Sequence, residues 1–137
     1  MESDGKMRGF FKKRYFLSSG LVLLLTLPTI ASAASYSYSF NITSSVTGNT
    51  KHTLSAGTVK TTAKGNTYSA DGGESSSKSK YQVGVQRFLT NYADPISANG
   101  SSYTKTIGSV NSGSYAVVVN KYSSTGYKVK GKGTINQ

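Results

Sequence analysis

Polar and apolar residues alternate along most of the chain from Ala34 onward. Residues 35–43 (SYSYSFNIT) place aromatic and aliphatic side chains on one face and Ser and Asn on the other. Strict alternation is typical of a half-buried β-strand, because successive strand side chains point to opposite faces. No stretch of residues 34–137 shows the three- to four-residue period of an amphipathic helix. The pattern predicts an all-β fold.

The same alternation predicts further strands along the chain. They are expected at residues 52–62, 67–70, 80–90, 102–110, 114–122 and 127–135. In 52–62, Leu54 and Ala56 are expected to point inward, and Gly57 to introduce a bulge that shifts the phase to Val59.

The segments between these strands carry turn and loop residues. A turn is expected at residues 64–66, an exposed loop at 71–79 (DGGESSSKS) and a longer connection at 91–101. About seven short strands at this spacing predict a small antiparallel β-sandwich or barrel formed by one domain, residues 34–137. The sandwich is favoured, and the pattern leaves a jelly-roll and an immunoglobulin-like topology open.

Two closing hairpins are expected near the C-terminus. Residues 111–113 would connect 102–110 to 114–122, and a three-residue loop ending at Gly126 would connect 114–122 to 127–135. This register pairs Val117 with Gly133 and buries Val117, Val119 and Ile135 on the core face. Lys128, Lys130 and Lys132 then line the opposite face.

The closing segment is similar to a known family. The phrases GSYAVVV at 113–119 and GYKV at 126–129 resemble the closing hairpins of bacterial pre-peptidase C-terminal domains. The resemblance covers about 20 residues, and it implies a secreted β-sandwich architecture.

Residues 1–33 have the three parts of a secretory signal peptide. Basic residues 12–14 precede an apolar run at 17–27, Pro28 breaks it, and Ala31-Ser32-Ala33 supplies a small-residue cleavage site. The alternative, a transmembrane anchor, needs about 20 apolar residues, and polar residues interrupt this run. We therefore expect cleavage after Ala33 and release of residues 34–137 outside the cell.

Composition narrows the possible partners. Residues 34–137 carry eleven Lys and Arg against three acids, a net charge of +8, and the chain has no cysteine. The absence of disulfides in a small exported domain suggests a bacterial origin. A strongly positive field attracts anionic polymers.

Catalysis is not expected from the residues available. His52 is the only histidine, which excludes a zinc site with several His or Cys ligands and leaves a serine triad dependent on this one side chain. A surface position for His52 is the favoured alternative. The three acids Asp71, Glu74 and Asp94 give weak support to a carboxylate pair, and neither an enzyme nor a cofactor is expected.

Calcium is the one metal weighed. Asp71 and Glu74 lie in one Gly-rich loop and could offer two carboxylates to a hard cation. A flexible loop kept soluble by its charges explains the same residues, so no metal site is expected.

The lysines are the strongest functional signal. Lys121, Lys128, Lys130 and Lys132 are the expected polyanion-binding residues, with cell-wall teichoic acid, acidic polysaccharide or an anionic membrane surface as partner. Nucleic acid is not expected as a partner in vivo. The alternative is that the lysines keep a strand face wet and prevent edge-to-edge pairing.

Tyrosines could add flat contact surface for a ligand. Tyr36, Tyr38, Tyr81 and Tyr115 alternate with polar residues and are expected to fill the core. The candidates for exposed contacts are Tyr92, Tyr103 and Tyr122. Two functions follow: a non-enzymatic exported protein that associates with anionic polymer, or an exported cationic toxin or antimicrobial protein that acts on membranes.

Overall fold

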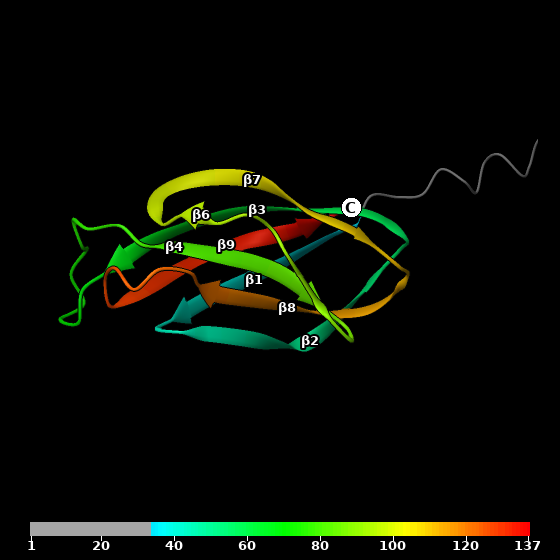
Figure 1. Ribbon diagram of the computed structural model, residues 1–137, viewed down its shortest axis with the longest axis horizontal. Coiled ribbons are helices and arrows are strands. Elements are labelled where there is room, and N and C mark those ends of the chain that lie inside the picture. Colours follow the sequence, from blue (N-terminus) through cyan, green and yellow to red (C-terminus); the bar gives the residue numbers. More distant parts are fainter. Residues whose placement is uncertain (1–33) are drawn as a thin grey trace, which may run out of the picture. The chain divides into compact units, whose positions relative to one another are not determined.

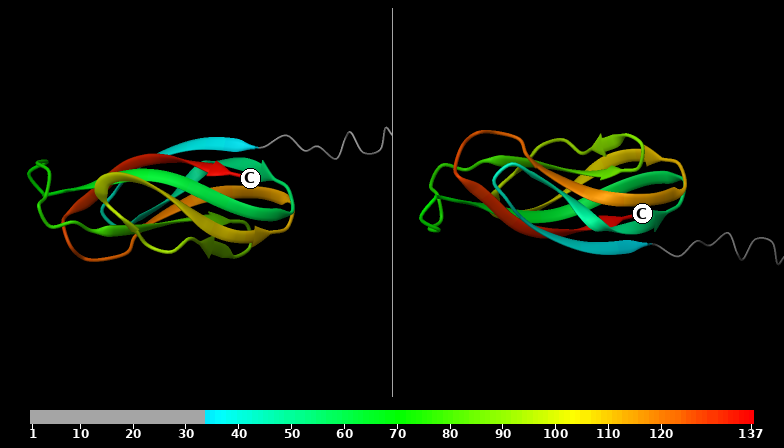
Figure 2. Two further views of the ribbon diagram at one scale, coloured as in Figure 1. Left: turned by 90° about the horizontal axis from the view of Figure 1, so that it is seen from above. Right: turned by 90° about the horizontal axis from the view of Figure 1, so that it is seen from below.

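The computed structural model describes residues 34–137. The predicted signal peptide, residues 1–33, lies outside the described residues. Within the described part, the chain forms strands and no helix, so it holds no helical segment able to span a bilayer. Two antiparallel sheets pack together, as Figures 1 and 2 show. The predicted all-β class and the sandwich are confirmed.

Each sheet is formed by strands from distant parts of the chain. The four-stranded sheet contains, in order across it, β1 (Ser35–Ile42), β9 (Lys128–Asn136), β3 (Gly57–Tyr68) and β7 (Asn99–Val110). The five-stranded sheet contains β2 (Ser45–Leu54), β8 (Gly113–Lys121), β4 (Lys80–Gln86) and β5 (Thr90–Tyr92), and the short β6 (Ile96–Ser97) pairs with β4.

Most connections cross from one sheet to the other. Only β4, β5 and β6 follow one another within a single sheet. The two predicted closing hairpins are therefore wrong: β8 pairs with β2 and β4, whereas β9 pairs with β1 and β3. Val117 lies opposite Val85, and Gly133 lies opposite Tyr38 and Ala63. Alternation specifies which face of a strand is apolar, and this face can be buried equally well with β8 and β9 in opposite sheets.

Three further strand predictions are corrected. The expected bulge at Gly57 is a turn at residues 55–56, with Leu54 buried and Ala56 exposed. The expected turn at 64–66 is the interior of β3, so no separate strand exists at 67–70. Strand β2 begins at Ser45, before the predicted start, because it is an edge strand whose exposed residues carry little apolar pattern.

The core lies between the two sheets. Val117, Val119 and Ile135 are buried in it, which confirms the predicted inward faces of β8 and β9. The core members are Phe40, Ile42, Leu54, Val59, Ala63, Tyr81, Val83, Val85, Ala93, Ile96, Ala98, Ile107, Val110, Tyr115, Val117, Val119, Val129 and Ile135. Residues 34–137, the part of the chain expected to remain after signal cleavage, form one compact unit that contains this core and every strand described above.

Aromatic rings fill the space above glycines on the inner face. Tyr81 and Tyr115 are buried, and Tyr36 and Tyr38 pack against the core, as predicted. The Phe40 and Tyr81 ring centroids are 5.1 Å apart. A Cβ on Gly133 would lie 2.6 Å from the Tyr38 hydroxyl, so the tyrosine occupies the place of the missing side chain.

Candidate anion-binding face

The outer face of the four-stranded sheet carries only polar side chains and Tyr68. Alternate residues of β1, β9 and β3 point away from the core and stand side by side in register. We call this surface the lysine face; its residues are Ser37, Ser39, Asn41, Lys60, Thr62, Lys64, Asn66, Tyr68, Lys128, Lys130, Lys132 and Thr134.

Two lysines stand directly opposite each other on this face. Lys64 of β3 is the register partner of Lys132 of β9, and both side chains are exposed. Lys130 follows on the same face of β9, about 6.7 Å further along the strand, opposite Asn66. Like charges in directly opposite positions destabilise a sheet. The arrangement therefore stores a repulsion that a bound anion would relieve.

The lysine pair lies between two shallow hollows. The larger, of about 550 Å³, is lined by residues that include Asn41, Tyr68 and Lys130. The second, of about 420 Å³, is lined by residues that include Ser37 and Thr134. Lys64 and Lys132 line both hollows, so an extended ligand lying across the face would pass between them.

One end of the larger hollow carries an aromatic ring. The Lys130 ammonium lies 5.2 Å from the centroid of the Tyr68 ring. Such a cation–π contact keeps the lysine on the face. The ring also offers flat, amphipathic surface beside the positive charge.

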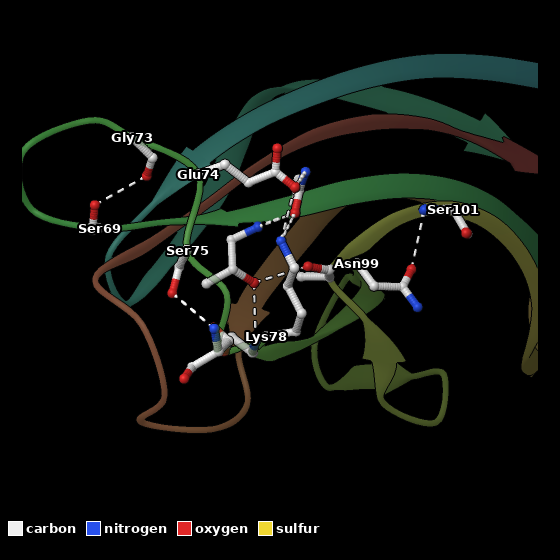
Figure 3. Close-up of polar contacts among 12 residues, drawn as sticks. Ser69, Gly73, Glu74, Ser75, Lys78, Asn99 and Ser101 are labelled. Carbon is white, nitrogen blue, oxygen red and sulfur yellow. Dashed lines mark hydrogen bonds and ion pairs between the residues drawn. The ribbon is translucent and has the colours of Figure 1, made fainter.

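The acid nearest to this face is already paired. Glu74 forms an ion pair with Lys78 at 2.9 Å and accepts a hydrogen bond from the Asn66 side-chain amide at 2.9 Å (Figure 3). These hydrogen bonds, first that from Asn66 and then that from Lys78, lower the pKa of Glu74 below its usual range. Glu74 therefore stays ionised, and its charge is neutralised by Lys78 and not by a lysine of the lysine face.

The acidic loop does not bring its two carboxylates together. Asp71 accepts hydrogen bonds from the Ser69 hydroxyl and the Gly73 backbone N–H, which lower its pKa. Glu74 points instead to Asn66 and Lys78. In residues 34–137 no three His, Asp or Glu side chains cluster as metal ligands would.

The predicted binding lysines divide between the two sheets. Lys128, Lys130 and Lys132 share the outer face of β9. Lys121 ends β8 in the other sheet and donates a hydrogen bond to the Ser123 carbonyl at 2.7 Å. The structure therefore separates Lys121 from the other three, because β8 and β9 do not form the expected hairpin.

The edge-protection explanation of these lysines is wrong for β9. Strand β9 lies between β1 and β3, so both of its edges are already hydrogen-bonded within the sheet. Charges on its outer face protect no free edge.

The predicted aromatic contacts lie apart from the lysine face. Tyr103 is half-buried against the core and accepts a hydrogen bond from the Asn99 amide, which corrects its expected exposure. Tyr92 is partly exposed and its ring covers Gly84 of the five-stranded sheet. Tyr122 is exposed in the connection between β8 and β9. The ring of His52, the single histidine, lies tilted against the Tyr36 ring, with the two ring centroids 4.5 Å apart.

The sequence pattern assigned only the three β9 lysines of the lysine face to binding, and the segment that holds three of the other residues was not expected to form one continuous strand. Lys64, Asn66 and Tyr68 fall in the segment assigned to a turn and a short strand. The available signal was the polar period-two series from Lys60 to Tyr68, which continues through Gly65 without a break. The turn was predicted because Gly65 and Asn66, which are common in turns, were given more weight than the alternation.

No family model, curated protein or solved structure matches this chain.

Proposed function

We propose that residues 34–137 are an exported, non-enzymatic domain that binds an anionic polymer through the lysine face. The observation that carries the proposal is the cross-strand pair of Lys64 and Lys132 between two hollows. The neighbouring Ser, Thr and Asn side chains supply neutral hydrogen-bonding groups for the hydroxyls of a polymer. Teichoic acid and acidic polysaccharide share this chemistry of repeated negative charge and hydroxyl groups.

The strand order supports a jelly roll for this domain. Without the two-residue β6, eight strands remain and can be numbered one to eight along the chain. Across the four-stranded sheet, the order is then first, eighth, third and sixth. Across the other sheet, the order is second, seventh, fourth and fifth. This is the order expected of an eight-stranded jelly roll, an architecture also found in lectins.

Binding should be tested with residues 34–137 and defined polymers. The probes are cell wall with and without teichoic acid, a uronic-acid polysaccharide, and neutral dextran as the uncharged control. We expect cosedimentation with the anionic probes in low salt and release in high salt. The distance over which charges act in solution, the screening length, shortens from about 10 Å at 0.1 M salt to about 3 Å at 1 M.

A charge-matched pair of variants locates the site. The site variant is Lys64→Gln/Lys130→Gln/Lys132→Gln, and the control is Lys51→Gln/Lys80→Gln/Lys121→Gln in the other sheet. Each lysine near an anionic surface contributes about 1 kcal/mol, so the site variant should lose about a hundredfold in affinity. The control should lose much less, although its net charge is the same.

Three results would contradict the proposal. Equal losses in the two variants would mean that net charge alone causes binding. Binding that survives both high salt and the site variant would point to the tyrosines. An absence of binding to every anionic probe would leave the lysines as a solvated surface.

A further inference from the structure

The turn between β4 and β5 exposes two large apolar side chains. Phe88 is 86% exposed and Leu89 is 81% exposed, well above the other exposed large apolar residues of the described chain. Both lie at the tip of a hairpin in which Gln86 is the register partner of Thr90. Neither side chain contributes to the core, so folding does not explain them.

The turn is held in place by hydrogen bonds. The Arg87 N–H donates to the Leu89 carbonyl at 3.2 Å, and the Gln86 amide donates to the Thr90 hydroxyl at 2.9 Å. The Arg87 guanidinium donates to the Ser112 carbonyl at 3.0 Å, which ties the tip to the neighbouring turn between β7 and β8. The two apolar side chains are therefore presented on a fixed turn.

Positive charge accompanies the tip. The Arg87 guanidinium carbon lies 4.9 Å from the centroid of the Phe88 ring. Lys51, which is exposed, and Gln86 are the register partners of Ala116 on the two sides of β8, so Lys51 lies level with the last residue pair before the tip. Asp71 and Glu74 lie in the loop after β3, at the opposite end of the sandwich (Figure 1). An apolar tip with cations beside it complements an anionic lipid surface.

We propose that the β4–β5 turn inserts Phe88 and Leu89 into an anionic lipid bilayer at the headgroup boundary. Arg87 then lies at the level of the lipid phosphates, to which a guanidinium binds well. A stable protein–protein interface buries about 1,200–2,000 Å², more than a projecting turn of two apolar side chains supplies. A fluid bilayer accepts such a projection because it adapts its shape to it. This site is separate from the lysine face and does not depend on the polymer-binding proposal.

The test compares two matched variants of residues 34–137. The tip variant is Phe88→Ser/Leu89→Ser. The control is Tyr122→Ser/Tyr127→Ser, which removes two rings, 56% and 53% exposed, from the connection between β8 and β9. Vesicles of phosphatidylcholine with phosphatidylglycerol, and of phosphatidylcholine alone, are the probes. We expect the tip variant to lose at least tenfold in binding to the anionic vesicles and the control to stay within twofold of wild type.

A fluorescent reporter shows insertion directly. The chain has no tryptophan, so Phe88→Trp places a single tryptophan at the tip, and excitation at the red edge of indole absorption separates its emission from that of the tyrosines. We expect a blue shift on anionic vesicles and quenching by brominated acyl chains. Tyr122→Trp, the reporter at the control site, should show neither.

The outcomes separate this proposal from the others. Part of the vesicle binding should persist at high salt, because salt does not screen the burial of apolar groups. The site variant, which lacks the three lysines of the lysine face, should keep this salt-resistant binding. Equal vesicle binding of wild type and tip variant, or a Phe88→Trp emission that lipid leaves unchanged, would overturn the proposal. A wild-type dimer that the tip variant abolishes, without vesicle binding, would assign the tip to a second copy.

Discussion

At the scale of single residues, the core contains a polar atom that the fold leaves without a partner. Tyr81 is fully buried, and among the described residues its hydroxyl is the one buried side-chain polar atom without a hydrogen bond. Burial raises its pKa well above the ordinary value of 10. Burial also raises the pKa of Tyr38 to about 12, although the hydrogen bond to Thr61 opposes the shift.

We expect Tyr81→Phe to keep or increase stability at neutral pH and to unfold at higher pH than wild type. An unsatisfied buried hydroxyl costs about 1–3 kcal/mol. Because burial raises the pKa of Tyr81, its ionisation takes no stability from the fold below pH 10, and above that pH the unfolded chain ionises first, so stability falls as the pH rises towards the folded-state pKa. Thermal unfolding at neutral pH and circular dichroism during an alkaline titration measure the two effects.

Tyr38→Phe is the matched control for this change. Its hydroxyl is hydrogen-bonded to Thr61 at 2.8 Å, so its removal should cost about 0.5–1.5 kcal/mol at neutral pH. A Tyr81→Phe variant that is destabilised by as much as Tyr38→Phe would show that the Tyr81 hydroxyl does have a partner.

At the scale of secondary-structure elements, β9 and β3 approach closely because both carry glycine on the inner face. Gly65 and Gly131 are register partners. A Cβ on Gly131 would lie 2.7 Å from both the Gly65 Cα and the Phe40 ring. The absent side chains leave room for Phe40 and Tyr81, which lie beneath this part of the lysine face.

Gly131→Ala should destabilise the domain by about 1–3 kcal/mol, the usual cost of overpacking. The contacts are with backbone as well as with a buried ring, so neither side can yield freely. Gly48→Ala is the control, because its Cβ would make an ordinary contact of 3.5 Å with the Val117 carbonyl. Denaturant unfolding measures both variants, and equal midpoints would contradict the close approach.

At the scale of the whole molecule, the crossing connections decide which charges stand together. Lys121 and Lys132 are close in sequence, yet they belong to different sheets. Lys64 and Lys132 are far apart in sequence and stand opposite each other. The lysine face is therefore a product of the strand order.

Processing of the whole chain remains a prediction from the N-terminal pattern. We expect cleavage between Ala33 and Ala34, because small residues at 31–33 follow the break at Pro28. Intact-mass analysis of the culture medium should find a protein that begins Ala34-Ser35-Tyr36. Full-length protein retained in the membrane fraction would contradict cleavage and release.

The pattern of side chains was enough to determine the class of fold and most buried positions. Alternation placed Phe40, Val117, Val119 and Ile135 on core faces correctly. This works because the direction of a strand side chain depends on local backbone geometry, which repeats every two residues. The outward direction of Lys128, Lys130 and Lys132 follows from the same rule.

Only the tertiary structure decided which strands pair and hence which side chains face a ligand. The apolar face of β8 would be buried equally well beside β9 or across the core from it, so its pattern cannot distinguish the two. Local turn signals were misleading at residues 64–66, where Gly65 serves close packing against Tyr81 and not a turn. Pairing depends on contacts between residues far apart in the sequence, and no local pattern specifies these. Local geometry therefore determined the directions of the lysines, and the strand order determined which lysines meet.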